Sequence, residues 1–167
     1  MAATEKPVMV IGIDDSEYAI AALEWTLDHF FSSTTNPPPF NFNLILLHAK
    51  PIPEVFVDVA GPGMVLGSAP GLYQVLDQHL KKKAGRIMEK AKQICAAKSV
   101  CDVEFVVEEG DARYVLCDAA NKHRASMLVV GSHGYGAIKR ALLGSVSDYC
   151  AHHAPCTVTI VKPKPNT

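Results

Sequence analysis

The sequence alternates short apolar runs with longer stretches of helical periodicity, and this alternation restricts the possible fold more than any other feature. Five runs have the length and apolar character of buried strands, namely residues 8–13, 43–49, 103–107, 127–130 and 156–161. Four segments repeat apolar residues at helical spacing, namely 19–30, 72–94, 112–119 and 146–153. Strands buried on both faces read as continuous apolar runs, because crossover helices cover both faces of a parallel sheet. The pattern therefore predicts an α/β fold, a doubly wound parallel sheet with helices on both faces.

The length and charge of the chain favour one globular domain that does not bind polyanions. A chain of 167 residues can bury roughly two-thirds of its unfolded surface around one core. We therefore expect a single domain over residues 1–167, with its core at about 8–162. The 16 Lys and Arg residues are balanced by 17 Asp and Glu residues, which gives a formal net charge of −1. This balance argues against binding to nucleic acid or to anionic membranes, both of which require a dense positive field.

The cysteines and the first residues favour a reduced intracellular environment. The odd set of five cysteines contains no C-x-x-C pair, and several lie in apolar runs where free thiols act as small hydrophobic residues. The apolar stretch at 8–13 is only six residues long, which is too short for a signal peptide or a membrane span. We therefore expect a cytoplasmic or nuclear protein.

Residues 50–71 form a connection several times longer than is usual in α/β domains. The segment holds four prolines and four glycines, which disfavour regular structure. Two interpretations stay open, because long connections of this kind are either functional or disordered. In the first, the segment is a lid or a partner surface, and in the second it is a linker.

The first candidate site residue is Asp14, which directly follows the first apolar run. In an open parallel sheet, ligands bind beyond the carboxyl ends of the strands, where the winding direction reverses. Ser16 is a favourable N-cap, so Asp14, Asp15 and Ser16 could form a purely structural turn. Two adjacent carboxylates repel each other, however, which a cap does not require. We therefore expect Asp14 to contact a ligand, and the structural turn is the alternative.

The second candidate is the glycine-rich stretch 131–147, which we call the glycine segment. Glycines let backbone N–H groups approach an anion closely, and a helix that begins at Ser145 directs its first N–H groups at whatever lies there. Two common nucleotide motifs are absent. Gly131-x4-Gly136 is followed by Ala137 instead of the lysine of a Walker A loop, and no G-x-G-x-x-G follows the first run. Glycines also mark ordinary turns, so the segment alone indicates phosphate only weakly.

The combined motifs resemble a known family. The glycine segment reads Gly131-x2-Gly134-x9-Gly144-Ser145, the first run leads into Ile-Gly-Ile-Asp14-Asp-Ser, and the second ends in Leu-Leu-His-Ala49. In these residues the chain resembles the ATP-binding branch of the universal stress protein family over residues 8–162, in the form of a plant-type single-domain member. The resemblance implies a five-stranded parallel sheet in the order 3-2-1-4-5, a homodimer and a bound adenine nucleotide, which is ATP, ADP or AMP.

The resemblance also implies positions around the nucleotide. Ile13 and Asp14 would lie by the adenine and the ribose, and the main chain of Ala49 would read the adenine edge. Val130 and Gly131 would face the ribose. The residues that would surround the phosphates are His133, Gly134, Gly144, Ser145, Val146 and Ser147.

Three details of this site stay open. Asp15 stands where the family commonly has glycine or phenylalanine, and its charge leaves the preference between triphosphate and monophosphate undecided. A Mg²⁺ ion with the phosphates would offset that charge. His133 either contacts phosphate or is an exposed turn histidine. Lys139 and Arg140 either supply charge to the phosphates or solvate the glycine segment.

Two other polar clusters have structural interpretations. Cys150, His152, His153 and Cys156 offer metal-type ligands, but they span a helix end without a recognised ligand spacing, so we expect no metal site. The three lysines at 81–83 are expected to be solvated surface of the long helix.

Three classes of function remain. The first is a homodimeric, nucleotide-dependent regulatory module of the stress response that acts on an unknown protein partner. The second is an enzyme, a slow ATPase or a transferase. No Ser/His/Asp triad or metal-ligand set is evident, so we expect no catalytic residues and at most weak ATP hydrolysis. The third is a chaperone-like interaction dimer. The dimer would form through the last run, from Cys156 to Val161, because an apolar edge strand needs a partner and a second copy supplies one by two-fold symmetry.

Overall fold

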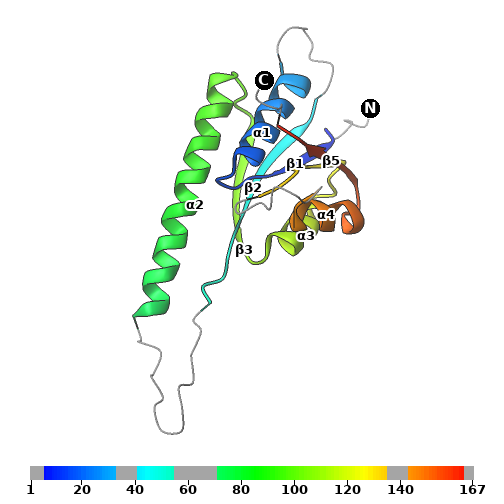
Figure 1. Ribbon diagram of the computed structural model, residues 1–167. Coiled ribbons are helices and arrows are strands. Elements are labelled where there is room, and N and C mark those ends of the chain that lie inside the picture. Colours follow the sequence, from blue (N-terminus) through cyan, green and yellow to red (C-terminus); the bar gives the residue numbers. More distant parts are fainter. Residues whose placement is uncertain (1–5, 33–40, 55–70, 135–142, 164–167) are drawn as a thin grey trace, which may run out of the picture.

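The predicted alternation of strands and helices is confirmed. The computed structural model describes residues 6–32, 41–54, 71–134 and 143–163, and within them five strands alternate with four helices (Figure 1). In chain order the elements are β1 (Val8–Gly12), α1 (Glu17–Phe30), β2 (Asn43–Lys50), α2 (Leu72–Ala97), β3 (Val103–Glu109), α3 (Ala112–Lys122), β4 (Met127–Gly131), α4 (Ser145–His153) and β5 (Thr157–Val161). The bounds differ from the predicted ones by three residues at most.

The sheet has the predicted order. All neighbouring strands are parallel, and they lie side by side as β3-β2-β1-β4-β5. The chain moves outward from the central β1 through β2 to β3, and it then returns to place β4 and β5 on the other side of β1. The winding direction therefore reverses between β1 and β4. Ligands of open α/β sheets bind at such a point, beyond the carboxyl ends of the strands.

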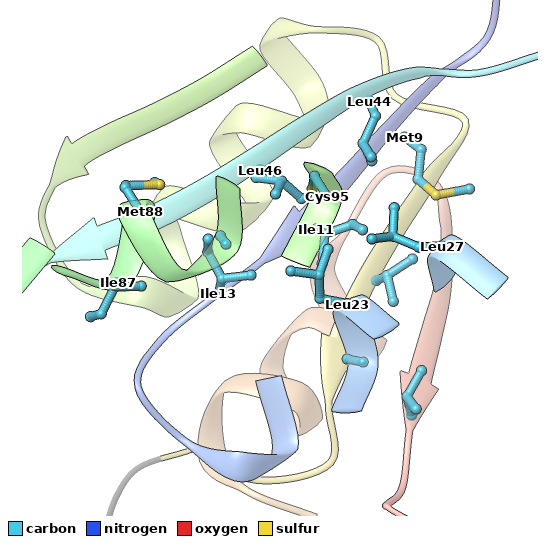
Figure 2. Close-up of a cluster of buried hydrophobic side chains, with 14 residues drawn as sticks. Met9, Ile11, Ile13, Leu23, Leu27, Leu44, Leu46, Ile87, Met88 and Cys95 are labelled. Atoms are coloured by element: carbon cyan, nitrogen blue, oxygen red, sulfur yellow. The ribbon is translucent and has the colours of Figure 1, made fainter. Parts of the chain in front are cut away.

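Alternate residues of the central strand pack against opposite helix layers. Met9 and Ile11 belong to a cluster with Leu23 of α1 and Met88 of α2 (Figure 2). Val10, which points to the other face, packs with residues of α3 and α4. All three β1 side chains are fully buried. Helices thus cover both faces of the sheet, which explains why β1 reads as a continuous apolar run.

A buried lysine ties α2 to the ends of two strands. Lys50 is the last residue of β2, and its Nζ lies 2.8 Å from Asp77 Oδ1 of α2 and 2.5 Å from Glu109 Oε2 of β3. The hydrogen bond from Lys50 lowers the pKa of Asp77, and the same bond raises the pKa of Lys50. From the sequence, Lys50 is predicted to be the first residue of the long connection at 50–71. That assignment was wrong, because the ion pairs allow a charged residue to end a buried strand.

Most of the connection predicted at 50–71 lies outside the described residues, so the choice between a lid and a linker stays open. Of the parts that are described, Pro51 contributes to the cavity discussed below. Across the described ranges, every helix is either too short or too polar to cross a bilayer.

Candidate functional site

A single cavity gathers all of the predicted nucleotide-contacting residues. It has a volume of about 550 Å³ and lies beyond the carboxyl ends of β1, β2 and β4. This volume is within the roughly 300–1,000 Å³ of typical small-molecule sites. We call it the strand-end pocket. The predicted residues on its wall are Ile13, Asp14, Ala49, Val130, Gly131, His133, Gly134, Gly144, Ser145, Val146 and Ser147.

Asp14 forms the structural turn and also lines the pocket, so its contact with a ligand stays a prediction. Its Oδ1 accepts a hydrogen bond of 2.8 Å from the N–H of Ser16, and the Ser16 hydroxyl in turn caps α1 by accepting from the N–H of Ala19. The other carboxylate oxygen, Oδ2, faces Gly134, since a Cβ atom on that glycine would lie 2.9 Å from it. Asp14 therefore shapes the turn with one oxygen and presents the other to the pocket beside the glycine segment.

Ile13 contributes a side chain rather than polar backbone groups. Its N–H donates to the carbonyl of Leu47 at 2.9 Å, and its carbonyl accepts from Nδ1 of His48 at 2.8 Å. Its side chain points into the buried cluster of Figure 2. The N–H of Ile13 is thus held by β2 and its carbonyl already accepts one hydrogen bond from β2, so Ile13 offers a ligand mainly apolar contact.

The backbone of Ala49 is directed into the pocket. Successive residues of a strand direct their N–H and C=O groups to opposite sides. The carbonyl of Leu47 accepts from Ile13 next to β1, whereas the carbonyl of Lys50 accepts from Gly110 after β3. The N–H and C=O groups of Ala49 point to the same side as those of Leu47, toward β1. The pairing of β1 with β2 ends at Gly12 and Leu47, so β1 no longer runs beside Ala49. The backbone groups of Ala49 therefore point into the space beyond β1, where a planar base could pair with them.

The two ends of the glycine segment are bound to each other through Ser132. Its carbonyl accepts from the N–H of Gly144 at 2.8 Å and from the hydroxyl of Ser147 at 2.9 Å. Its own N–H donates to the carbonyl of Val161 in β5. Ser147 is buried, so the hydrogen bond from its hydroxyl joins the two ends of the glycine segment away from solvent. The N-terminus of α4 is thereby fixed opposite the end of β4.

The start of α4 differs from the other short helices in how it is capped. Side chains of Ser16 and Asp111 cap α1 and α3. Gly144 precedes α4, and within the described ranges no side chain caps this helix. The first N–H groups of a helix need an acceptor, and a phosphate or carboxylate can supply it. The uncapped N-terminus of α4 therefore suits an anionic group in the pocket.

Gly131 is required by close packing. A Cβ atom there would lie 2.7 Å from the backbone carbonyl of Tyr18 in the first turn of α1. The missing side chain thus lets α1 approach the end of β4.

His133 packs against Tyr18 on the pocket wall. The ring of Tyr18 lies 5.0 Å from that of His133, whose Nδ1 is 3.2 Å from the Ser132 hydroxyl. His133 is partly buried on the pocket wall, so it is not a freely exposed turn residue. Lys139 and Arg140 lie outside the described residues.

Sequence reasoning missed the residues that helices contribute to the pocket. Lys83 was expected to be solvated surface, and this was wrong. Its Nζ lies 3.0 Å from Asp15 Oδ2, and both residues line the pocket. Leu80 lies three residues earlier on the same helix, and Leu116 of α3 contributes a further apolar wall. The apolar periodicity of α2 was the available signal, because Lys83 borders the stripe that contains Leu80 and Ala84.

His48 also lines the pocket and was not among the predicted site residues. It is buried within β2, and its Nδ1 must carry a proton to donate to the Ile13 carbonyl. In the neutral ring this leaves Nε2 as a hydrogen-bond acceptor. A polar residue inside an apolar run was the signal in the sequence. Within the described ranges, no group of three or more His, Cys, Asp or Glu side chains is arranged to hold a metal ion.

Comparison with known proteins finds a family match over most of the chain. The model of the Universal stress protein family matches residues 7–162. A universal stress protein A-like protein from Arabidopsis thaliana is 31% identical over 142 residues, which cover 84% of this chain and 76% of that protein. The longer universal stress protein PHOS34 from the same plant is 29% identical, and the match covers 91% of this chain and 60% of its length.

A solved structure extends the likeness to a ligand-bound protein. The crystal structure of a universal stress protein family protein from Arabidopsis thaliana with AMP bound has 25% sequence identity and a TM-score of 0.63. The superposed parts cover 95% of this chain and 94% of that one.

Proposed function

Because the chain belongs to the universal stress protein family, we propose that it is a homodimeric regulatory protein whose strand-end pocket binds AMP, ADP or ATP. The observation that carries the proposal is the division of one cavity into two chemically different ends. At the end of β2 the pocket has the backbone of Ala49, and its wall also includes the apolar side chains of Leu80 and Leu116, which together suit a planar base with a polar edge. Near β4 the uncapped N-terminus of α4 suits a phosphate.

The position of Asp14 supports a nucleoside between these two ends. Asp14 follows the central strand β1, which lies between β2 and β4, and its Oδ2 is directed at the glycine segment. A carboxylate oxygen accepts hydrogen bonds, and ribose hydroxyls donate them. The AMP in the Arabidopsis structure supports an adenine nucleotide as the ligand.

The direct test is binding of AMP to the purified protein by isothermal titration calorimetry. We expect the wild type to bind AMP, and Asp14→Ala to weaken adenosine, AMP and ATP together by about tenfold or more. Loss of one charge-assisted hydrogen bond is worth about 1.5–3 kcal/mol, and it falls on the part shared by all three ligands. Asp118→Ala, which removes an exposed carboxylate of α3, is the matched control and should bind like the wild type.

The same titration separates the alternatives. Wild-type protein that binds none of the three ligands contradicts the proposal. Turnover of labelled ATP distinguishes a slow ATPase from a binding module. Capture of a protein partner that depends on the nucleotide distinguishes a regulatory module from a chaperone-like dimer.

The homodimer is proposed to form through β5, the last strand of the described sheet. The carbonyl of Val161 accepts from Ser132 on the side of β4, so the backbone groups of Val158, three residues earlier, face the free edge. An apolar strand with a free edge is an aggregation hazard, and antiparallel pairing with a second copy removes it.

A proline on this edge should therefore separate the two copies. We expect Val158→Pro to sediment as a monomer, because proline removes an outward N–H. Val158→Ala loses the same side chain but keeps the N–H, so it should remain dimeric. Sedimentation velocity distinguishes the two, and a dimeric Val158→Pro protein would exclude β5 as the interface.

A further inference from the structure

An ion pair crosses the rim of the strand-end pocket between two elements that are far apart in the sequence. Asp15 follows β1, and Lys83 lies in the middle of α2. The Lys83 ammonium is 3.0 Å from the Asp15 carboxylate, and each side chain is about one-third exposed. Both residues line the pocket. The pair is therefore partly shielded from solvent and lies next to any ligand in the cavity.

The pair determines the charge balance of the pocket wall. Among the described lining residues, the carboxylates are Asp14 and Asp15, and Lys83 is the only lysine or arginine. Asp15 without Lys83 would leave two uncompensated negative charges, whereas Lys83 without Asp15 would leave the wall neutral. Adenine ligands differ mainly in charge, since adenosine is neutral, AMP carries about two negative charges and ATP about four.

We propose that the Asp15–Lys83 pair sets how the pocket discriminates among adenine ligands by their charge. Because the ion pair has no net charge, one pocket can accept both a monophosphate and a triphosphate. Either partner alone shifts the preference, Asp15 toward adenosine and Lys83 toward ATP. The inference rests on the proposed nucleotide binding. It makes the side chains of Asp15 and Lys83 responsible for the preference between monophosphate and triphosphate.

The size of the effect follows from Coulomb interactions in a partly hydrated site. If the separation between the ion pair and a ligand phosphate is taken as about 8 Å, two unit charges in a medium close to water interact by about 0.5 kcal/mol, which is about twofold in affinity per ligand charge. Removal of one pocket charge should therefore change AMP binding by about fourfold and ATP binding by about fifteenfold at low ionic strength. Adenosine binding should stay within about twofold of the wild type.

The experiment is a set of titrations of three variants with adenosine, AMP and Mg²⁺-free ATP. Lys83→Met should weaken AMP and, more strongly, ATP. Asp15→Asn should strengthen the same ligands in the same order. The double variant has the same net charge as the wild type, so it should restore the wild-type order of affinities. Moderate salt should reduce all of these differences, because the Debye length shrinks to about 8 Å at physiological ionic strength.

Controls separate this effect from general changes in charge or folding. Lys82→Met removes an exposed lysine next to Lys83 that is absent from the pocket wall, and it should leave every affinity unchanged. Circular dichroism should show that all variants are folded. Asp15→Asn provides a gain of affinity, which misfolding does not produce.

The outcomes distinguish this inference from the proposed function. Wild-type protein that binds no adenine ligand overturns both. Binding by the wild type with equal changes for adenosine, AMP and ATP overturns the inference alone. A double variant that stays as weak as Lys83→Met also overturns it, because Lys83 would then act by direct contact instead of by charge balance with Asp15.

Discussion

Valine in place of Gly134 is expected to weaken the binding of both adenosine and AMP by at least about tenfold in a chain that stays folded. A Cβ atom at this position would lie 2.9 Å from Asp14 Oδ2, and a branched side chain extends further into the same space. Either the carboxylate or the backbone of the glycine segment must move. Both changes remove hydrogen-bonding groups from the wall of the strand-end pocket. Calorimetric titration measures the two affinities.

Gly71→Val is the matched control for this substitution. Nothing lies within 4 Å of a Cβ atom at Gly71, which precedes α2, and this residue is absent from the pocket wall. We expect its affinities to equal those of the wild type. Wild-type affinity in Gly134→Val would show that the contact between Asp14 and the glycine segment does not form part of the ligand site.

Truncation of Ile11 to alanine is expected to lower the free energy of unfolding by about 3–4 kcal/mol. Ile11 lies on the central strand, is 0% exposed and packs in the cluster between the sheet and the layer of α1 and α2 (Figure 2). The substitution removes buried methyl and methylene groups and leaves a cavity where neighbours from three strands limit relaxation. Urea unfolding should show a lower midpoint with an unchanged slope.

An exposed strand residue provides the comparison. Val107 on the edge strand β3 is 45% exposed, so Val107→Ala should cost less than about 1 kcal/mol. Equal losses for Ile11→Ala and Val107→Ala would contradict the described core.

The sheet could be predicted from the sequence because β1, β2 and β4 are buried on both faces and therefore read as apolar runs. β3 was predicted two residues short. Its last residues, Glu108 and Glu109, pair with Ala49 and Lys50 of β2, and the Lys50 ion pair stabilises this polar end. Apolar patterning carries no information about such an extension, because a partner on another strand supplies the compensating charge.

The pocket residues on loops and strand ends could be predicted because parallel strands bring their carboxyl ends to one edge of the sheet. Residues contributed by helix faces could not be identified in this way. Lys83 reaches Asp15 only because α2 has a particular rotation and position on the sheet, which depend on how Ile87 and Met88 pack below it. The run of three lysines does not by itself select the one facing inward, and only the position of Lys83 beside the apolar stripe of α2 distinguishes it.

The strand order also governs when the chain can fold during its synthesis. The residues up to Glu109 supply β1, β2 and β3, which build the sheet on only one side of β1. The other side of β1 stays unpaired until Met127–Gly131 has left the ribosome, so the nascent chain carries an open apolar edge. The strand-end pocket is divided in the same way, because Asp14 and Ala49 precede β3 in the chain and Ser145 follows β4. A ligand of this pocket can therefore stabilise the chain only after the segment from Gly144 to Ser147 has also been synthesised.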